Sequence, residues 1–255
     1  MDLKDVYAFS YDYLIKQSSP YVSQKQIDVF LTTPDIGKCD SLIDAFRMLL
    51  IILQDFNRFP QVIKYVERQD TFKSLLHDYD LNYVASCSPE TLLEEFRSSF
   101  HFEKDALWMR YTKGIISGAK YLSQFKDYAS FKNVCDSYDT NIQQRIKFAK
   151  YLSKNIYNMG FAIACNWLKE LGYVEYSKPD THIKDICGAL RLASPRDDVE
   201  CFRAVGTVAQ EAGVSAYSVD KVWWLICSGN FYRYDIQIPG SNLKEAFIKE
   251  LIKRF

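Results

Sequence analysis

Hydrophobic residues recur along this sequence at the three- and four-residue spacing that is typical of amphipathic helices. The strongest stripe follows Ser41 and consists of Leu42, Ala45, Phe46, Leu49, Leu50 and Leu53. Similar stripes predict helices over residues 24–31, 70–81, 107–125, 142–155, 161–171, 180–192, 199–212, 218–227 and 242–255. No segment alternates hydrophobic and polar positions over more than about five residues, the usual length of a strand. The pattern therefore predicts an all-α fold.

Residues that cap or break helices support these boundaries. Ser88 and Pro89 precede a hydrophobic stripe, and they are of the types preferred at the N-cap and at the first helical position. Gly114 and Gly118 interrupt the helix predicted over residues 107–125. With only 10 Gly and 7 Pro, the chain lacks the many tight turns that an all-β meander needs.

Length and composition narrow the classes of protein further. The chain has 255 residues, of which 48% are hydrophobic, so it can bury a sizeable core and is not disordered. Its 32 basic and 32 acidic residues cancel, which excludes a polybasic protein that binds by bulk charge. Neutrality does not exclude nucleic acid, because one basic face can be balanced elsewhere.

The spacing of the cysteines limits the metal sites that the chain can hold, and the N-terminal residues indicate the cell compartment. The seven cysteines lie at least fourteen residues apart, which excludes CxxC zinc and redox motifs. The N-terminus lacks the basic and apolar regions of a signal peptide, and the longest apolar run, over residues 48–53, is too short for a membrane span. We therefore expect reduced thiols in a cytoplasmic protein, nucleoid-associated if bacterial, that is neither secreted nor bound to a membrane.

A basic segment ends in a tight turn in the second half of the chain. Residues 141–160 contain no acid, and their four basic residues are Arg145, Lys147, Lys150 and Lys154. The turn over residues 156–160 joins two predicted helices and ends in Gly160. Such a turn is either a plain helical hairpin or a phosphate-binding site, in which the N–H groups that begin the second helix face an anion.

The segment that follows distinguishes these two interpretations. Sixteen residues after Ala164, Asp180 stands in the run Lys178-Pro179-Asp180-Thr181-His182-Ile183. A helical hairpin followed at this distance by Asp-Thr-His resembles the helix-hairpin-helix DNA glycosylases of the endonuclease III superfamily. Weaker similarities to this superfamily lie over residues 88–125, 187–193 and 222–232. The resemblance covers roughly residues 40–235.

This resemblance implies a fold and a division of the chain. It implies two helical subdomains with a cleft between them and a helix-hairpin-helix motif. We expect an N-terminal segment, residues 1–40, that packs with the C-terminal half. A helical subdomain would then span residues 41–140, and residues 141–255 would hold the hairpin and the C-terminal helices.

The resemblance also implies a catalytic carboxylate, Asp180. Placed beside an extruded nucleotide, a carboxylate stabilises positive charge that develops at the anomeric carbon, and it orients or deprotonates the attacking water. The alternative is that Asp180 is only a helix N-cap, a common place for aspartate.

Other candidate residues are carried over from the same resemblance. The candidate DNA contacts are Lys154, Asn158, Met159, Gly160, Ala162, Lys178 and His182. Solvated lysines and a histidine bonded to backbone are the plain alternatives among them. The candidate base-pocket residues are Gln54, Asn57, Trp223 and Trp224. Because adjacent helical residues point in different directions, one of the two tryptophans is expected in the core.

Three departures from the superfamily pattern qualify the expected chemistry. Asn158 replaces the first hairpin glycine, and asparagine tolerates a left-handed conformation better than most residues. Ala162 stands where strand-cleaving members carry a lysine, and alanine cannot form an imine. Residues 232–255 contain no cysteine, so the iron–sulfur cluster of some members cannot be held there.

The sequence thus predicts a monofunctional DNA N-glycosylase that flips a damaged or modified base out of duplex DNA and hydrolyses its glycosidic bond. We expect a monomer with no cofactor and no metal. The alternative is a non-catalytic helix-hairpin-helix DNA-binding protein. No motif in the sequence identifies the base.

Overall fold

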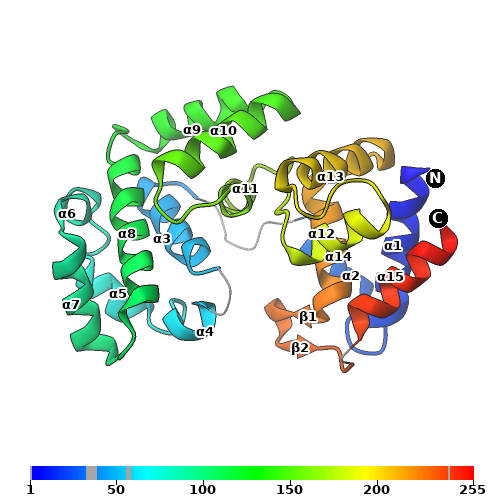
Figure 1. The fold of residues 1–255 in the computed structure, drawn as a ribbon, viewed down its shortest axis with the longest axis horizontal. Helices are drawn as coiled ribbons and strands as arrows, with labels where there is room; N and C mark the ends of the chain where they lie inside the picture. The colour runs from blue at the N-terminus through cyan, green and yellow to red at the C-terminus, as the bar shows by residue number, and fades with distance from the viewer. Residues whose placement is uncertain (1, 33–38, 56–58, 241) are drawn as a thin grey trace. The chain divides into compact units, whose positions relative to one another are not determined.

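A computed structural model describes residues 2–32, 39–55, 59–240 and 242–255. Its regular structure consists of helices α1 to α15, one 3-10 turn and a two-stranded ribbon (Figure 1). The all-α prediction is therefore confirmed. Over the described residues, no helix is long and apolar enough to cross a membrane.

The chain forms two compact units. One comprises residues 36–167 and is called the middle unit; the other combines residues 1–35 with residues 168–255 and is called the terminal unit. The division falls inside α11 (Phe161–Glu170). It therefore lies downstream of the boundary expected at residue 140, because α9 and α10 belong to the middle unit.

The middle unit is built around its longest helix, α8. In the chain, α3 to α7 come before α8, and α9 and α10 come after it. Their bounds are α3 (Leu42–Leu53), α4 (Phe59–Ile63), α5 (Gln69–Leu75), α6 (Leu81–Ser86), α7 (Pro89–Phe100), α8 (Asp105–Leu122), α9 (Tyr128–Tyr138) and α10 (Ile142–Asn155). Helices α3, α6 and α7 pack against α8. A cluster of buried aromatic rings, Phe72, Phe96, Trp108 and Tyr111, fills the space among them.

Two glycines of α8 explain how closely its neighbours approach. A Cβ at Gly118 would lie 2.3 Å from Cδ2 of Leu49 on α3, and a Cβ at Gly114 would lie 3.2 Å from the carbonyl oxygen of Tyr157. These glycines, which the sequence presents only as weak interruptions, are the sites where α8 contacts α3 and the turn after α10.

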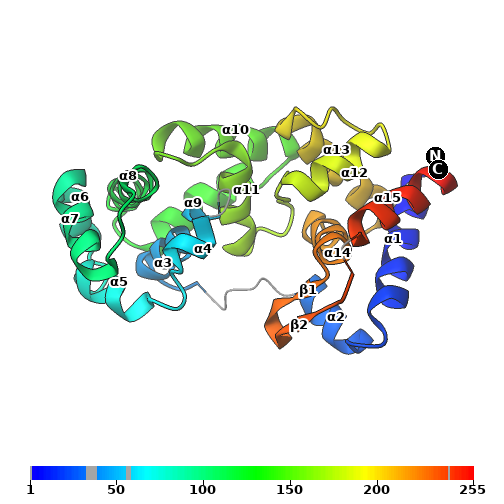
Figure 2. The same cartoon turned by 60° about the horizontal axis from the view of Figure 1, so that its bottom comes forward.

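The terminal unit is organised around α14. Its elements are α1 (Leu3–Ser18), α2 (Gln24–Thr32), α12 (Thr181–Ala189), α13 (Asp198–Ala212), α14 (Ala216–Ser228), β1 (Asn230–Phe231), η1 (Tyr232–Tyr234), β2 (Ile236–Gln237) and α15 (Leu243–Arg254). Helix α14 contacts α1, α2, α12, α13 and α15, and these helices surround it in both ribbon views (Figures 1 and 2). The two chain ends lie side by side, where Phe9 of α1 packs against Phe247 and Phe255.

The hydrophobic stripes locate most helices but not every break between them. The helix expected over residues 70–81 ends after Leu75, because His77, Asp78 and Tyr79 all have positive φ. A new helix, α6, then begins where the Asp80 carboxylate accepts hydrogen bonds from two backbone amides. Helix α9 was not predicted; a capping box between Asp127 and Ser130 starts it.

Candidate functional site

The predicted helical hairpin is present in the middle unit as α10, the turn over residues 156–160 and the start of α11. Asn158 has φ of 62°, so the expected left-handed conformation at this position is confirmed. The first backbone hydrogen bond of α11 runs from the Ala164 amide to the Gly160 carbonyl, at 2.9 Å. The amides before Ala164 therefore form the N-terminus of α11, where helices favour anions.

Two side chains of α8 form hydrogen bonds with this turn. The Ser117 hydroxyl accepts a hydrogen bond of 2.8 Å from the Tyr157 amide. The Arg110 guanidinium donates to Oδ1 of Asn158 at 2.8 Å, while Nδ2 of Asn158 is buried and has no partner in the described chain. The asparagine thus adds a side-chain contact that glycine at this position could not make.

Gly160 and its neighbours differ in what they can offer to a ligand. A Cβ at Gly160 would have no atom within 4 Å, so the backbone here is open to close approach. Met159 is only 2% exposed, so Gly160, which is exposed, is the more accessible of the two for contact with a ligand. Ala162 is half-buried in the first turn of α11.

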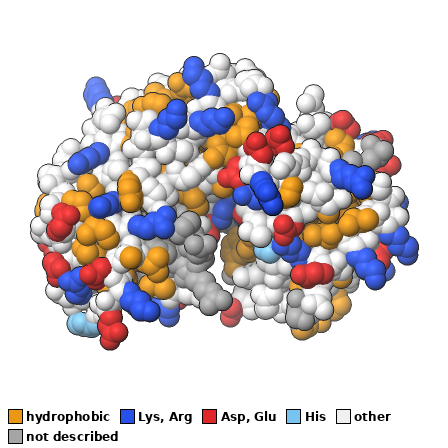
Figure 3. Space-filling view, in the orientation of Figure 1, with side chains coloured by type: hydrophobic (Ala, Val, Ile, Leu, Met, Phe, Trp, Pro, Cys, Tyr) orange, Lys and Arg blue, Asp and Glu red, His pale blue; other side chains and the backbone are white. Residues whose placement is uncertain are grey.

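Three lysines form a basic face on α10. Lys147, Lys150 and Lys154 are exposed, and their spacing of three and four residues places them on one side of the helix. Arg145 differs, because its Nε forms a 2.5 Å ion pair with Asp139. Figure 3 shows Lys and Arg side chains gathered over the part of the molecular surface where Figure 1 places α9 and α10.

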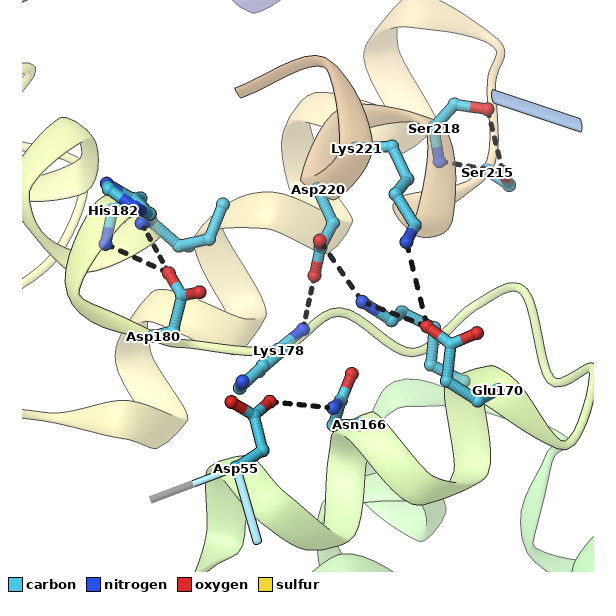
Figure 4. Close-up of polar contacts among 12 residues, drawn as sticks. Asp55, Asn166, Glu170, Lys178, Asp180, His182, Ser215, Ser218, Asp220 and Lys221 are labelled. Carbon is cyan, nitrogen blue, oxygen red and sulfur yellow. Dashed lines mark hydrogen bonds and ion pairs between the residues drawn. The ribbon is translucent and has the colours of Figure 1, made fainter. Parts of the chain in front are cut away.

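In the terminal unit, Asp180 is the N-cap of α12. Its Oδ1 accepts hydrogen bonds from the amides of His182, at 2.9 Å, and Ile183, at 3.2 Å (Figure 4). The half-buried carboxylate is thus oriented by the helix, whose dipole favours negative charge at this end. N-capping and catalysis are compatible roles, because capping uses one oxygen of the carboxylate.

His182 and Lys178 flank this carboxylate in the sequence. Burial lowers the pKa of His182 although Asp180 acts to raise it, and Nδ1 of His182 is buried without a partner in the described chain. Lys178 is half-buried, and its backbone amide donates to Oδ2 of Asp220 (Figure 4).

The base-pocket candidates occupy different environments. Gln54 is 7% exposed and accepts a hydrogen bond from the Tyr65 amide, so it joins the end of α3 to the chain after α4. Trp223 is fully buried and donates from Nε1 to the Ser10 hydroxyl, which identifies it as the core tryptophan of the pair. Trp224 is half-buried against Tyr232. Asn57 lies outside the described residues.

The structure thus groups the candidates by unit. Lys154, Asn158, Met159, Gly160 and Ala162 lie together at the hairpin, and Lys178, Asp180 and His182 lie together before and within α12. Throughout the described ranges, no group of three or more His, Cys, Asp or Glu residues is placed to hold a metal ion.

Sequence reasoning missed two residues that support these groups, Arg110 and Asp220. Arg110 lies 48 residues from Asn158, and Asp220 lies 42 residues from Lys178. The signal available for Asp220 was a pair of adjacent charged residues, Asp220 and Lys221, in front of the hydrophobic run of α14.

Comparison with known proteins gives structural matches only. The sequence matches no protein-family model and no curated protein. The 8-oxoguanine DNA glycosylase of Thermotoga maritima superposes with a TM-score of 0.55 and 16% identity, over 90% of this chain and 99% of that protein. The Methanocaldococcus jannaschii 8-oxoguanine glycosylase/lyase, solved with DNA containing 8-oxoguanine, superposes with a TM-score of 0.54 and 16% identity, over 84% of this chain and 95% of that protein. This chain therefore has the fold of these DNA glycosylases.

Proposed function

We propose that this protein is a DNA N-glycosylase in which Asp180 is the catalytic carboxylate. One observation carries the proposal: a carboxylate is held at the N-terminus of α12, downstream of a helical hairpin, in the fold of DNA glycosylases. Glycosidic cleavage passes through an oxocarbenium-like transition state, which a nearby anion stabilises. The hairpin and the α10 lysines would bind the phosphate backbone, and the target nucleotide would be extruded from the duplex.

The substrate to test first is a duplex that contains 8-oxoguanine. The structural neighbours act on this base, and it is a purine that an aromatic side chain such as Trp224 can stack against. Duplexes with alkylated and deaminated bases complete the panel.

The variant Asp180→Asn separates catalysis from folding. Asparagine is as good an N-cap as aspartate, so α12 remains capped while the negative charge is lost. We expect the single-turnover rate of base release to fall by about 10²- to 10⁴-fold, with duplex affinity retained. Asp12→Asn, at an exposed aspartate of α1, is the matched control.

Full activity of Asp180→Asn would overturn the role of Asp180. Duplex binding without base release by the wild type, on every base of the panel, would support the non-catalytic DNA-binding alternative instead.

We further propose that base release occurs by hydrolysis, without an imine at position 162. A neighbour is named glycosylase/lyase, but Ala162 has no amine. The wild type should leave an abasic strand that breaks only on treatment with alkali. Ala162→Lys should gain a covalent DNA complex that borohydride reduction traps, whereas Ala162→Gln, of similar length, should not. Trapping by the wild type would refute the proposal and direct attention to another lysine, such as Lys178.

A further inference from the structure

Four charged side chains are buried together at the junction of α11 and α14. This buried ion cluster consists of Lys169, Glu170, Asp220 and Lys221, each between 3% and 6% exposed. The Lys169 Nζ lies 3.3 Å from Oδ1 of Asp220 and 3.7 Å from Oε1 of Glu170. The Lys221 Nζ lies 3.7 Å from the same Glu170 oxygen (Figure 4). Charged groups are almost never buried to this degree without a specific arrangement of partners.

Aromatic side chains complete the surroundings of the two ammonium groups. The ring of Tyr217, which is fully buried, lies 5.9 Å from the Lys169 Nζ and 5.4 Å from the Lys221 Nζ. The Lys221 ammonium also donates a hydrogen bond of 2.8 Å to the Tyr232 hydroxyl. The end of α11 and the first half of α14 therefore share a charge-balanced cluster of two ammonium and two carboxylate groups.

This cluster holds the segment that leads to Asp180. The Tyr217 amide donates to the Val174 carbonyl at 2.8 Å, and Oδ2 of Asp220 accepts from the Lys178 amide. Helix α14 thus holds residues 174 and 178 of a stretch that has no helix or strand of its own.

From Lys178 the connection to the Asp180 carboxylate is short. The Lys178 carbonyl accepts a 2.7 Å hydrogen bond from the Asp180 amide, and Pro179 between them has a fixed φ and no N–H. The position of Asp180 therefore depends on where the Lys178 backbone is held.

A purely stabilising role does not require charges, because well-packed apolar residues usually stabilise a core as well as a buried ion cluster does. An acceptor for the Lys178 amide does require an oxygen at position 220. We propose that Asp220 is a positioning residue: it fixes the Lys178 backbone and so holds the Asp180 carboxylate in its catalytic position. This inference rests on the proposed glycosylase function.

Two double variants test the inference with matched charge. Lys169→Met with Asp220→Ala, and Lys169→Met with Asp220→Asn, each remove one positive and one negative charge. Both leave Glu170 and Lys221 as a neutral pair. They differ in that asparagine keeps an oxygen that accepts the Lys178 N–H, and alanine does not.

The measurements are the single-turnover rate of base release at saturating 8-oxoguanine duplex, the duplex Kd and the hydrogen-exchange rate of the Lys178 amide. We expect the alanine variant to release base about 10- to 100-fold more slowly than the asparagine variant, because small misplacements of a reacting group are costly. The Kd values should agree within about threefold, since the hairpin is unchanged. The Lys178 amide should exchange faster in the alanine variant only.

Circular dichroism shows whether each variant is folded. If the alanine variant does not fold, the asparagine variant is compared with the wild type instead. In that comparison, protection of the Lys178 amide together with a rate within about tenfold of wild type supports the inference.

The outcomes separate this inference from the function on which it rests. Equal rates in the two folded double variants, or a rate difference matched by the Kd difference, would overturn the positioning role while base release by the wild type stands. A wild type that releases no base would overturn the proposed function, and the positioning role with it. If the alanine variant does not fold, the positioning role would also be overturned by an asparagine variant whose Lys178 amide is unprotected and whose rate is more than about tenfold below that of the wild type.

Discussion

At the scale of the residue, His182 links the stability of the terminal unit to pH. Burial lowers the pKa of His182 below its ordinary 6.5, so the folded protein takes up the proton less readily than the unfolded chain. The unfolded chain therefore binds more protons below about pH 6.5, and the free energy of unfolding falls there as pH decreases.

The variant His182→Asn should weaken this dependence. Between about pH 7.5 and about pH 5.5, the wild type should lose more free energy of unfolding than the variant does. Denaturant titrations at several pH values measure both. Parallel pH profiles for the two proteins would show that His182 is protonated equally in the folded and unfolded states.

At the scale of the element, the contact of α8 with α3 depends on Gly118. A Cβ at this position would lie 2.3 Å from Leu49 Cδ2, so Gly118→Ala forces the helices apart or the leucine out of its rotamer. We expect a loss of about 1–3 kcal/mol in the free energy of unfolding. Gly160→Ala is the matched control, because its Cβ meets no atom within 4 Å and the loss should stay below about 1 kcal/mol, the N-cap preference for glycine over alanine.

The same control variant tests the hairpin as a DNA contact. If the backbone at Gly160 approaches a phosphate, a methyl group there removes one charge-assisted hydrogen bond, worth about 1.5 kcal/mol or about tenfold in Kd. Fluorescence anisotropy with a labelled duplex measures this difference. Unchanged affinity would place the DNA contact elsewhere.

The basic face of α10 makes a separate prediction about salt. Changing Lys147, Lys150 and Lys154 together to glutamine should reduce the slope of log K against log salt by about 0.9 for each lysine that contacts phosphate. Changing the exposed Lys16, Lys249 and Lys253 instead alters the net charge equally and is the control. Equal effects of the two triple variants would mean that net charge alone, rather than this face, governs binding.

At the scale of the whole molecule, the sequence predicts features that depend on neighbours in the chain. The α3 stripe, the Ser88 cap and the left-handed Asn158 could be predicted because periodicity, capping and backbone preference act locally. The three left-handed residues after α5 could not, because none of His77, Asp78 and Tyr79 is a glycine.

The candidate site divides in the same way. Asp180 could be found from its neighbours in sequence, whereas the Asp220–Lys169 pair joins residues 51 positions apart. The role of Gly118 depends likewise on the distant Leu49. Such contacts are set by how helices pack, and a single sequence carries no direct record of that packing.

Because the terminal unit combines residues 1–35 with residues 168–255, its first helices are synthesised long before the helices that they pack against. Val6 and Leu14 of α1 are buried against residues of α13 and α14 in a single core. Helix α13 begins at Asp198, so α1 leaves the ribosome about 180 residues before its partner, or roughly ten to forty seconds at usual elongation rates. The middle unit is complete within that interval and can fold first. Nascent α1 and α2 therefore spend this interval with hydrophobic faces that α13 and α14 cannot yet cover, and exposed apolar surface of this kind is what chaperones bind.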